Sequence, residues 1–224
     1  MPTLEVGPGA GQATAELLTR GASPLIAVEP DKALARYLVE RFGGEVDVFN
    51  VPFEEFEMAP ASVSLAVSAS AWHWVDQARG LSRIARFVEP GGWWAAWWTL
   101  YHDPEEPDAL YKALTPLLKP IPLVSAQRKN GSSAEAFVVD RERHTAELLA
   151  TSAFEHVEVD KFRWAIELDP PRARSLFGTF SPILALPPSE RENVLDRIEQ
   201  VIDDEFDGLA TRRCVTILYT AQRL

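Results

Sequence analysis

Short apolar runs alternate with amphipathic segments through the first hundred residues of the chain. The apolar runs are rich in Val, Leu, Ile and Ala and predict buried strands, beginning with the run that ends at Val6. Later strands are expected at residues 24–29, 45–49, 63–68 and 93–99. Helices, indicated by apolar residues at helical spacing, are expected at residues 13–19, 33–42 and 76–87. This alternation predicts a parallel, doubly wound α/β sheet with ligand sites at the carboxyl ends of its strands.

The second half of the chain predicts more helices and two further strands. The helices are expected at residues 104–119, 141–151, 169–177 and 190–206. The strands are expected at residues 154–167 and 215–221. Two helical insertions, at about residues 104–140 and 170–207, are expected over the strand ends, where they would determine substrate selectivity.

Three glycines follow the first apolar run at every second position, as Gly7, Gly9 and Gly11. Glycine adopts positive φ without steric cost and lets a ligand lie against bare backbone, so this turn is a candidate cofactor cradle. The dinucleotide fingerprint would place its third glycine at the position of Gln12. A nicotinamide-dependent oxidoreductase is therefore the weaker alternative.

Glu29 ends the second predicted strand, twenty residues after Gly9. At this separation a β-α-β unit presents a carboxylate to the hydroxyls of a ribose. One carboxylate can accept both hydrogen bonds that a diol donates. The order of strand, helix and strand favours this role over the alternative, a solvated strand end.

The composition narrows the classes of ligand and the location. The 224 residues carry 22 Lys and Arg against 33 Asp and Glu, a formal charge of −11 that repels nucleic acids and leaves a small molecule as the expected partner. No apolar run is long enough to span a membrane, and no export signal opens the sequence. The single cysteine, Cys214, forms no internal disulfide, and no His or Cys cluster predicts a metal site. A cytoplasmic location is expected.

Five segments in order resemble the successive motifs of class I S-adenosylmethionine-dependent methyltransferases. They are LEVGPGAGQAT, AVEPD, PFEEF, SASAWHWVD and VEPGGWWAAWW, which span residues 4–100. The resemblance is closest to the small-molecule branch with a His-Trp pair after strand four. It implies a Rossmann-like sheet of seven strands in the order 3-2-1-4-5-7-6, with the last strand antiparallel and helices on both faces.

The resemblance also implies the cofactor, its site and the division of the chain. S-adenosylmethionine would be bound and S-adenosylhomocysteine released by a single domain, residues 1–224, with its cofactor-binding half at 1–100 and its substrate-side helices and antiparallel strands at 101–224. In the family, the counterpart of Glu29 holds the ribose, that of Phe53 flanks the adenine, and that of Ser68 lies near the amino acid part. The cofactor-binding residues expected are Glu5, Gly7, Pro8, Gly9, Gly11, Gln12, Glu29, Pro30, Phe53 and Ser68.

Three features depart from the family pattern. Pro52 stands where an acid usually accepts a hydrogen bond from the adenine amine, and Val63-Ser64 replaces the usual Phe-Asp pair. Family members also have helices before the first motif that cover the cofactor, whereas this sequence begins almost on the first strand. The alternative to methyl transfer by in-line displacement is therefore a non-catalytic or impaired relative that keeps the fold.

His73 is the candidate catalytic base because it follows strand four between Trp72 and Trp74 and titrates near neutrality. A base is needed only if the acceptor must lose a proton. The structural alternative is that His73 caps the next helix or hydrogen-bonds a neighbouring loop. Four tryptophans of the fifth strand, at residues 93, 94, 97 and 98, are expected in the core, because a central strand is buried on both faces.

Overall fold

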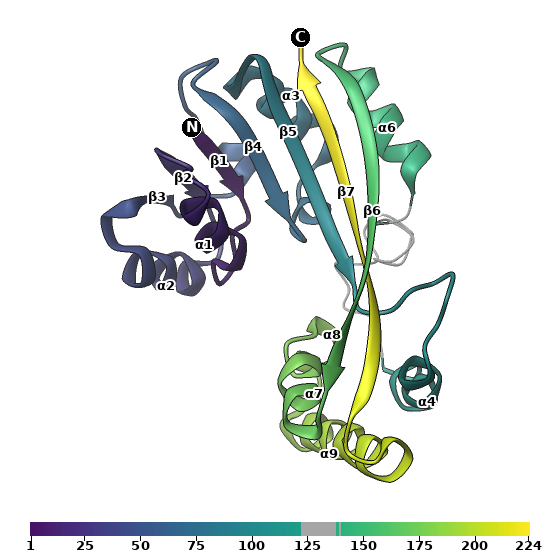
Figure 1. Ribbon diagram of the computed structural model, residues 1–224. Coiled ribbons are helices and arrows are strands. Elements are labelled where there is room, and N and C mark those ends of the chain that lie inside the picture. Colours follow the sequence, from purple (N-terminus) through teal and green to yellow (C-terminus); the bar gives the residue numbers. More distant parts are fainter. Residues whose placement is uncertain (122–137, 139) are drawn as a thin grey trace. The chain divides into compact units, whose positions relative to one another are not determined.

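The computed structural model describes residues 1–121, 138 and 140–224 (Figure 1). Its contacts divide the chain into two compact units. The first unit comprises residues 1–98, 138–160 and 217–224, and the second comprises the described part of 99–137 together with 161–216. Part of the expected insertion at 104–140 lies outside the described residues.

Seven strands form one sheet in the order β3-β2-β1-β4-β5-β7-β6, which confirms the predicted topology. Neighbouring strands from β3 through β5 pair in parallel, and β7 runs antiparallel to its neighbours (Figure 1). The strands are β1 (Thr3–Val6), β2 (Leu25–Val28), β3 (Val46–Phe49), β4 (Val63–Ala69), β5 (Val88–Leu100), β6 (Phe154–Leu168) and β7 (Ala210–Arg223). The strands β5 and β7 are longer than the sequence predicts.

Two helices of the first unit begin at aspartate caps. Asp31 accepts hydrogen bonds from the backbone N–H groups of Ala33 and Leu34, and Asp76 accepts one from Arg79. These caps fix the start of two helices that flank the sheet. The helices of this unit are α1 (Gln12–Thr19), α2 (Lys32–Phe42), α3 (Gln77–Phe87) and α6 (Arg141–Ala150), with short 3-10 turns η1 (Gly43–Glu45), η2 (Phe53–Glu55) and η3 (Trp72–Trp74).

The core of the first unit lies between the sheet and these helices. All four residues of β1 are buried, and α3 buries Leu81, Ile84 and Phe87 at helical spacing. Burial of each of the three apolar side chains of α3 contributes roughly 1.5–3 kcal/mol. Phe53 of η2 packs edge-on against Phe87, with ring centroids 6.4 Å apart, so the core reaches the strand ends.

The strand β5 is not buried equally on its two faces. Trp94 and Trp98 are 1% and 3% exposed, on the side where Trp98 stacks with His144 of α6. Trp93 points to the opposite face and is 39% exposed, while Trp97 is half-buried. The prediction that all four tryptophans belong to the core is therefore wrong for Trp93, because its face of the strand is less covered than a central strand requires.

The second unit has a helical core of its own. It contains α4 (Ala109–Leu118), α7 (Pro170–Phe177), α8 (Ser181–Leu184) and α9 (Pro188–Phe206). Phe177, Ile198 and Ile202 are fully buried where α7 packs against α9. The helix α4 begins five residues later than predicted, because Asp108 caps it by accepting from the N–H of Tyr111 at 2.6 Å.

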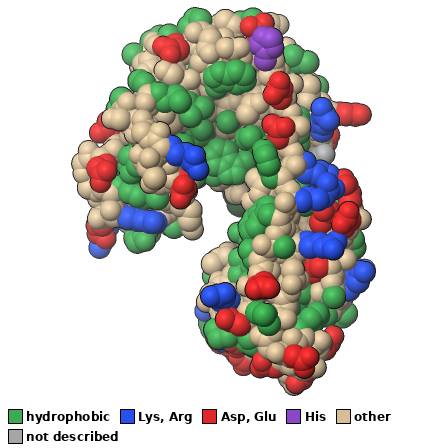
Figure 2. Space-filling model, in the orientation of Figure 1, with side chains coloured by type: hydrophobic (Ala, Val, Ile, Leu, Met, Phe, Trp, Pro, Cys, Tyr) green, Lys and Arg blue, Asp and Glu red, His purple; other side chains and the backbone are tan. Residues whose placement is uncertain are grey.

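Charged side chains of both signs are interspersed on the surface. Figure 2 shows acidic and basic side chains lying next to one another on one face of the molecule. In the second unit, for example, Arg174 of α7 binds Asp196 and Glu199 of α9, each at 2.7 Å. Among the described residues, no helix is both long and apolar enough to cross a membrane.

Candidate functional site

A pocket of about 550 Å³ lies at the carboxyl ends of β1, β2 and β4, within the first unit. This is the edge of the sheet where the alternating pattern predicts a ligand site. The structure brings together at this pocket seven of the ten predicted cofactor-binding residues, Gly7, Pro8, Gly9, Gln12, Glu29, Pro30 and Phe53. Its volume is within the range of small-molecule sites, which is about 300–1,000 Å³.

The three glycines of the turn all have positive φ, but their surroundings differ. A Cβ atom at Gly7 would lie 2.5 Å from the Cβ of Ala71, and one at Gly11 would lie 2.5 Å from the ring of Phe42. A Cβ atom at Gly9 would meet no atom within 4 Å. Gly7 and Gly11 are therefore required for packing of the protein itself, whereas Gly9 leaves bare backbone facing the pocket.

Glu29 links the glycine turn to the end of β2. Its Oε2 accepts a hydrogen bond from the N–H of Gly9 at 3.0 Å, and its Oε1 accepts one from the N–H of Asp31 at 2.9 Å. The residue is only 5% exposed, yet it lines the pocket. A carboxylate has about four acceptor sites, so each oxygen keeps capacity for one further donor.

Asn50 supports this end of β2, and sequence reasoning missed it. Its side-chain amide donates to the backbone carbonyls of Glu29 at 2.9 Å and Pro30 at 3.0 Å. The residue directly follows β3, the strand that pairs with β2. Its position directly after the strand that pairs with β2 is the feature of the sequence that could have identified it.

Three predicted cofactor contacts, Glu5, Gly11 and Ser68, are not among the residues that line the pocket. The Ser68 hydroxyl donates to the carbonyl of Val6 at 2.9 Å, and the side chain is fully buried. Glu5 is also fully buried, and the Thr14 hydroxyl donates to its Oε2 at 2.7 Å. The structure therefore gives Glu5 and Ser68 supporting positions within the sheet.

The buried position of Glu5 changes its acidity. Burial raises the pKa of this carboxyl to about 7, the Thr14 hydrogen bond acts in the opposite direction, and the charge of Glu29 raises it further. The desolvation of the anion is the largest of these causes. Glu5 therefore changes protonation near neutral pH.

Several residues that line the pocket were not among the ten predicted cofactor-binding residues. Trp74 lines the pocket with its side chain 56% exposed, and Glu54 lines it while its Oε1 accepts from the N–H of Asp76 at 2.8 Å. Ser70 has a φ of +53°, which is uncommon for a residue other than glycine, and its N–H donates to the carbonyl of Trp97 at 2.8 Å. Such strained residues cluster at ligand sites.

His73 lies on η3 beside the pocket but does not line it. The indole N–H of Trp98 donates to its Nδ1 at 3.1 Å, and burial lowers the pKa of the imidazole to about 4. A neutral imidazole that accepts at Nδ1 carries its proton on Nε2. His73 is thus held by Trp98 of β5, while Asp76 caps the helix that follows.

Comparison with known proteins locates the family signal in the first half of the chain. Residues 4–96 match the model of the methyltransferase domain family. Uncharacterized methyltransferases of Mycobacterium bovis and Mycobacterium tuberculosis are 35% identical over 89 residues. That match covers 40% of this chain and 36% of each relative, so the chain aligns with about a third of these relatives' length.

Solved structures extend the similarity of fold to the whole chain. A provisionally assigned type II methyltransferase of Anaeromyxobacter dehalogenans superposes with a TM-score of 0.66 at 21% identity, covering 99% of this chain and 89% of that one. A phosphoethanolamine N-methyltransferase of Haemonchus contortus, solved with S-adenosyl-L-methionine, has a TM-score of 0.59 at 14% identity, covering 99% of this chain and 48% of that one.

The sheet order and these superpositions define a Rossmann-like methyltransferase fold. The motif-bearing residues 4–96 add the family match. The chain therefore has the fold of class I methyltransferases, and its residues 4–96 are similar to the methyltransferase domain family.

Proposed function

We propose that this chain transfers a methyl group from S-adenosylmethionine to a small-molecule acceptor by in-line displacement. The observation that carries the proposal is the pairing of Gly9 with Glu29 at the strand ends. It combines bare backbone facing the pocket with a carboxylate that retains acceptor capacity. S-adenosylmethionine, when bound, supplies a methyl group that is already activated on a sulfonium.

The pocket residues fit the parts of this cofactor. Glu29 would accept from the ribose hydroxyls, because each of its oxygens holds only one backbone donor. Phe53 would flank the adenine from η2, and the turn from Gly7 to Gly9 would lie under the methionine part. Glu54, which lines the same pocket, would offer an acceptor near the adenine in place of the acid that Pro52 replaces.

The task of the remaining residues would be alignment and exclusion of water rather than acid–base chemistry. His73 would support this alignment from η3, where the indole N–H of Trp98 holds its ring at Nδ1. Trp74 would shield the pocket mouth with its large exposed ring. An acceptor that needs deprotonation would have to lose its proton to another group or to solvent.

The acceptor class is supported by charge and by structural neighbours. A formal charge of −11 disfavours nucleic-acid acceptors. Structural neighbours include the Haemonchus contortus enzyme, which acts on phosphoethanolamine, and a geranyl diphosphate C-methyltransferase of Streptomyces coelicolor. A small organic acceptor is the proposal that fits both observations.

The decisive test measures binding and turnover separately. Calorimetry should show micromolar binding of S-adenosylhomocysteine, and methyl-labelled S-adenosylmethionine should label members of a small-molecule acceptor panel. Binding without transfer to any acceptor would favour the non-catalytic alternative. Preference for NADH would refute the proposed cofactor and revive the oxidoreductase alternative.

A further inference from the structure

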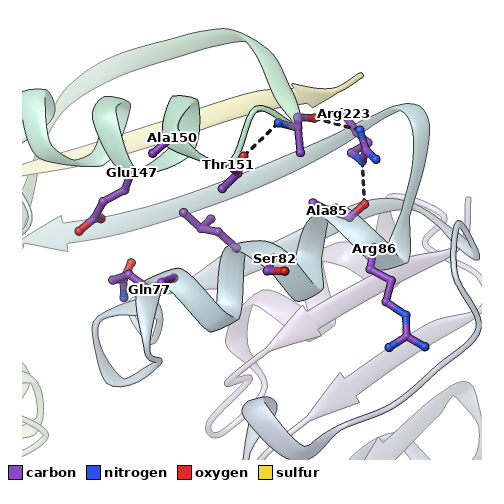
Figure 3. A pocket seen from close by; sticks show the side chains of 11 residues that line it. Gln77, Ser82, Ala85, Arg86, Glu147, Ala150, Thr151 and Arg223 are labelled. Atoms are coloured by element: carbon purple, nitrogen blue, oxygen red, sulfur yellow. Dashed lines mark hydrogen bonds between the residues drawn. The ribbon is translucent and has the colours of Figure 1, made fainter.

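The first unit contains a second cavity that shares no residue with the cofactor pocket. It lies between α3 and α6 and has a volume of about 650 Å³ (Figure 3). We call it the α3–α6 groove and define it by Gln77, Ala78, Leu81, Ala85, Glu147 and Ala150. Its volume is as suitable for a small molecule as that of the cofactor pocket.

One end of the groove presents two oxygen acceptors. The Gln77 side-chain amide donates to the carbonyls of Trp72 at 2.9 Å and Val75 at 2.8 Å. Because both partners are acceptors, the NH₂ group must face them, and this fixes the position of Oε1. That oxygen is buried and has no hydrogen-bond donor among the residues that the structure describes.

Glu147 supplies the second acceptor and a negative charge. Its Oε1 accepts from Nε of Arg143 at 2.8 Å. Its Oε2 is buried and lies 3.7 Å from Nδ1 of His144, beyond hydrogen-bond distance. Figure 3 shows Gln77 and Glu147 at the same end of the groove, one from each helix. Buried acceptors of this kind call for a donor.

The rest of the groove has apolar walls, two hydroxyl groups and, away from Gln77, the guanidinium groups of Arg86 and Arg223. Ala78, Leu81, Ala85 and Ala150 provide small or apolar walls. At the far end, Nε of Arg223 donates to the carbonyl of Ala85 at 2.6 Å (Figure 3). The buried, unpartnered atoms at the end formed by Gln77 and Glu147 are therefore both acceptors, and Glu147 carries a negative charge there, whereas the other end of the groove is basic.

We propose that the α3–α6 groove binds a primary ammonium attached to an apolar chain. An ammonium has three donors and no acceptor, which matches the free oxygens of Gln77 and Glu147, and its bond to the carboxylate is charge-assisted. The chain would lie along Leu81 and the alanines. A neutral alcohol offers one donor without charge, and a carboxylate would be repelled by Glu147.

The test uses hexylammonium as the probe and the full chain labelled with ¹⁵N. Titration should shift amide resonances of α3 and α6, and hexylammonium should bind at least tenfold more tightly than hexanol or hexanoate. Glu147→Gln should weaken binding about tenfold through loss of the charged acceptor. Ala150→Leu, at an exposed position, should project a larger side chain into the groove and displace the bound chain. The matched control Glu142→Gln removes an exposed charge from the same helix outside the groove and should change nothing.

The following results would each overturn the proposal. They are no shifts in α3 or α6, hexanol binding as tightly as the ammonium, and binding unchanged by Glu147→Gln. If that variant does not fold, as judged by circular dichroism, the comparison of Ala150→Leu with the wild type decides the question. Binding that survives Ala150→Leu would likewise refute the site.

Discussion

The backbone N–H of Gly9 donates a hydrogen bond to the carboxylate of Glu29 across 3.0 Å. This bond joins the turn after β1 to the end of β2, two segments twenty residues apart in the sequence. Because the second oxygen of Glu29 holds the N–H of Asp31, the same carboxylate also fixes the start of the turn into α2. Glu29, the proposed acceptor for the ribose hydroxyls, thus also holds the glycine turn that we propose lies under the cofactor.

Glu29→Gln should therefore weaken cofactor binding and destabilise the protein together. A carboxamide has one acceptor oxygen, so its NH₂ group would face one of the two backbone donors, at a cost of about 1–3 kcal/mol. Calorimetry should show at least tenfold weaker binding of S-adenosylhomocysteine. Glu40→Gln, at an exposed position on α2, is the matched control and should alter neither binding nor the midpoint of urea unfolding. Unchanged binding in Glu29→Gln would exclude the ribose role.

Alanine substitutions should separate the roles of the three glycines. Gly9→Ala meets no neighbouring atom and should cost only the left-handed backbone penalty, about 1–2 kcal/mol, while its methyl group blocks the cofactor. Gly7→Ala and Gly11→Ala add clashes at 2.5 Å to that penalty and should lower the melting temperature much further. Thermal melts and calorimetry on the three variants provide the comparison. A Gly9→Ala protein that binds the cofactor normally would contradict the proposed cradle.

The strands and the glycine turn could be predicted because their determinants are local. Gly9 lies three residues after the first apolar run and Glu29 ends the second, and carboxyl ends of parallel strands converge at one edge of the sheet. The direction in which Glu5 points could not be predicted, because it depends on which face of β1 the Thr14 side chain packs against. A strand pattern does not specify which helix covers that face.

Side-chain contacts between different elements of the sheet could not be predicted, for the same reason. The bond from Trp98 to His73 requires a particular register of β5 beside the end of β4, and no local pattern encodes that register. The exposure of Trp93 depends on what covers one face of β5. Both features are set by tertiary packing rather than by the period of apolar residues.

Glu5→Gln should stabilise the protein at high pH. The carboxyl has a pKa of about 7 in the fold and about 4.5 when unfolded, so the native state binds more protons between these values and stability falls as pH rises through them. The amide retains an acceptor for the Thr14 hydroxyl but carries no charge. Urea unfolding at pH 8 should show a gain of up to about 3 kcal/mol, which shrinks towards pH 4.5. Glu16→Gln, on the surface of α1, serves as the control with a flat profile. A pH-independent effect of Glu5→Gln would rule out this linkage.

His73 should remain a neutral Nε2–H tautomer throughout the neutral pH range. Burial holds its pKa at about 4, below the ordinary value of 6.5, and Trp98 occupies Nδ1. The ¹⁵N chemical shifts should show an unprotonated Nδ1 and a protonated Nε2 that do not change from pH 8 to pH 5. Trp98→Phe removes the donor and should release this tautomer preference. Titration of His73 near pH 6.5, or a proton on Nδ1, would instead support its use as a base.

The lowered pKa of His73 also makes the stability of the protein fall at acid pH. Between pH 4 and 6.5 the unfolded imidazole binds a proton that the native one does not, so its contribution to stability is lost as pH falls through this window. His73→Gln keeps an acceptor for Trp98 but does not titrate. The decrease in the free energy of unfolding between pH 6.5 and pH 5 should therefore be about 2 kcal/mol smaller in this variant than in the wild type. His156→Gln, with a side chain 64% exposed in the wild type, is the matched control and should leave the profile unchanged. Equal pH profiles for His73→Gln and the wild type would show that His73 has the same pKa in the native and unfolded states, which would restore it as a candidate for acid–base catalysis.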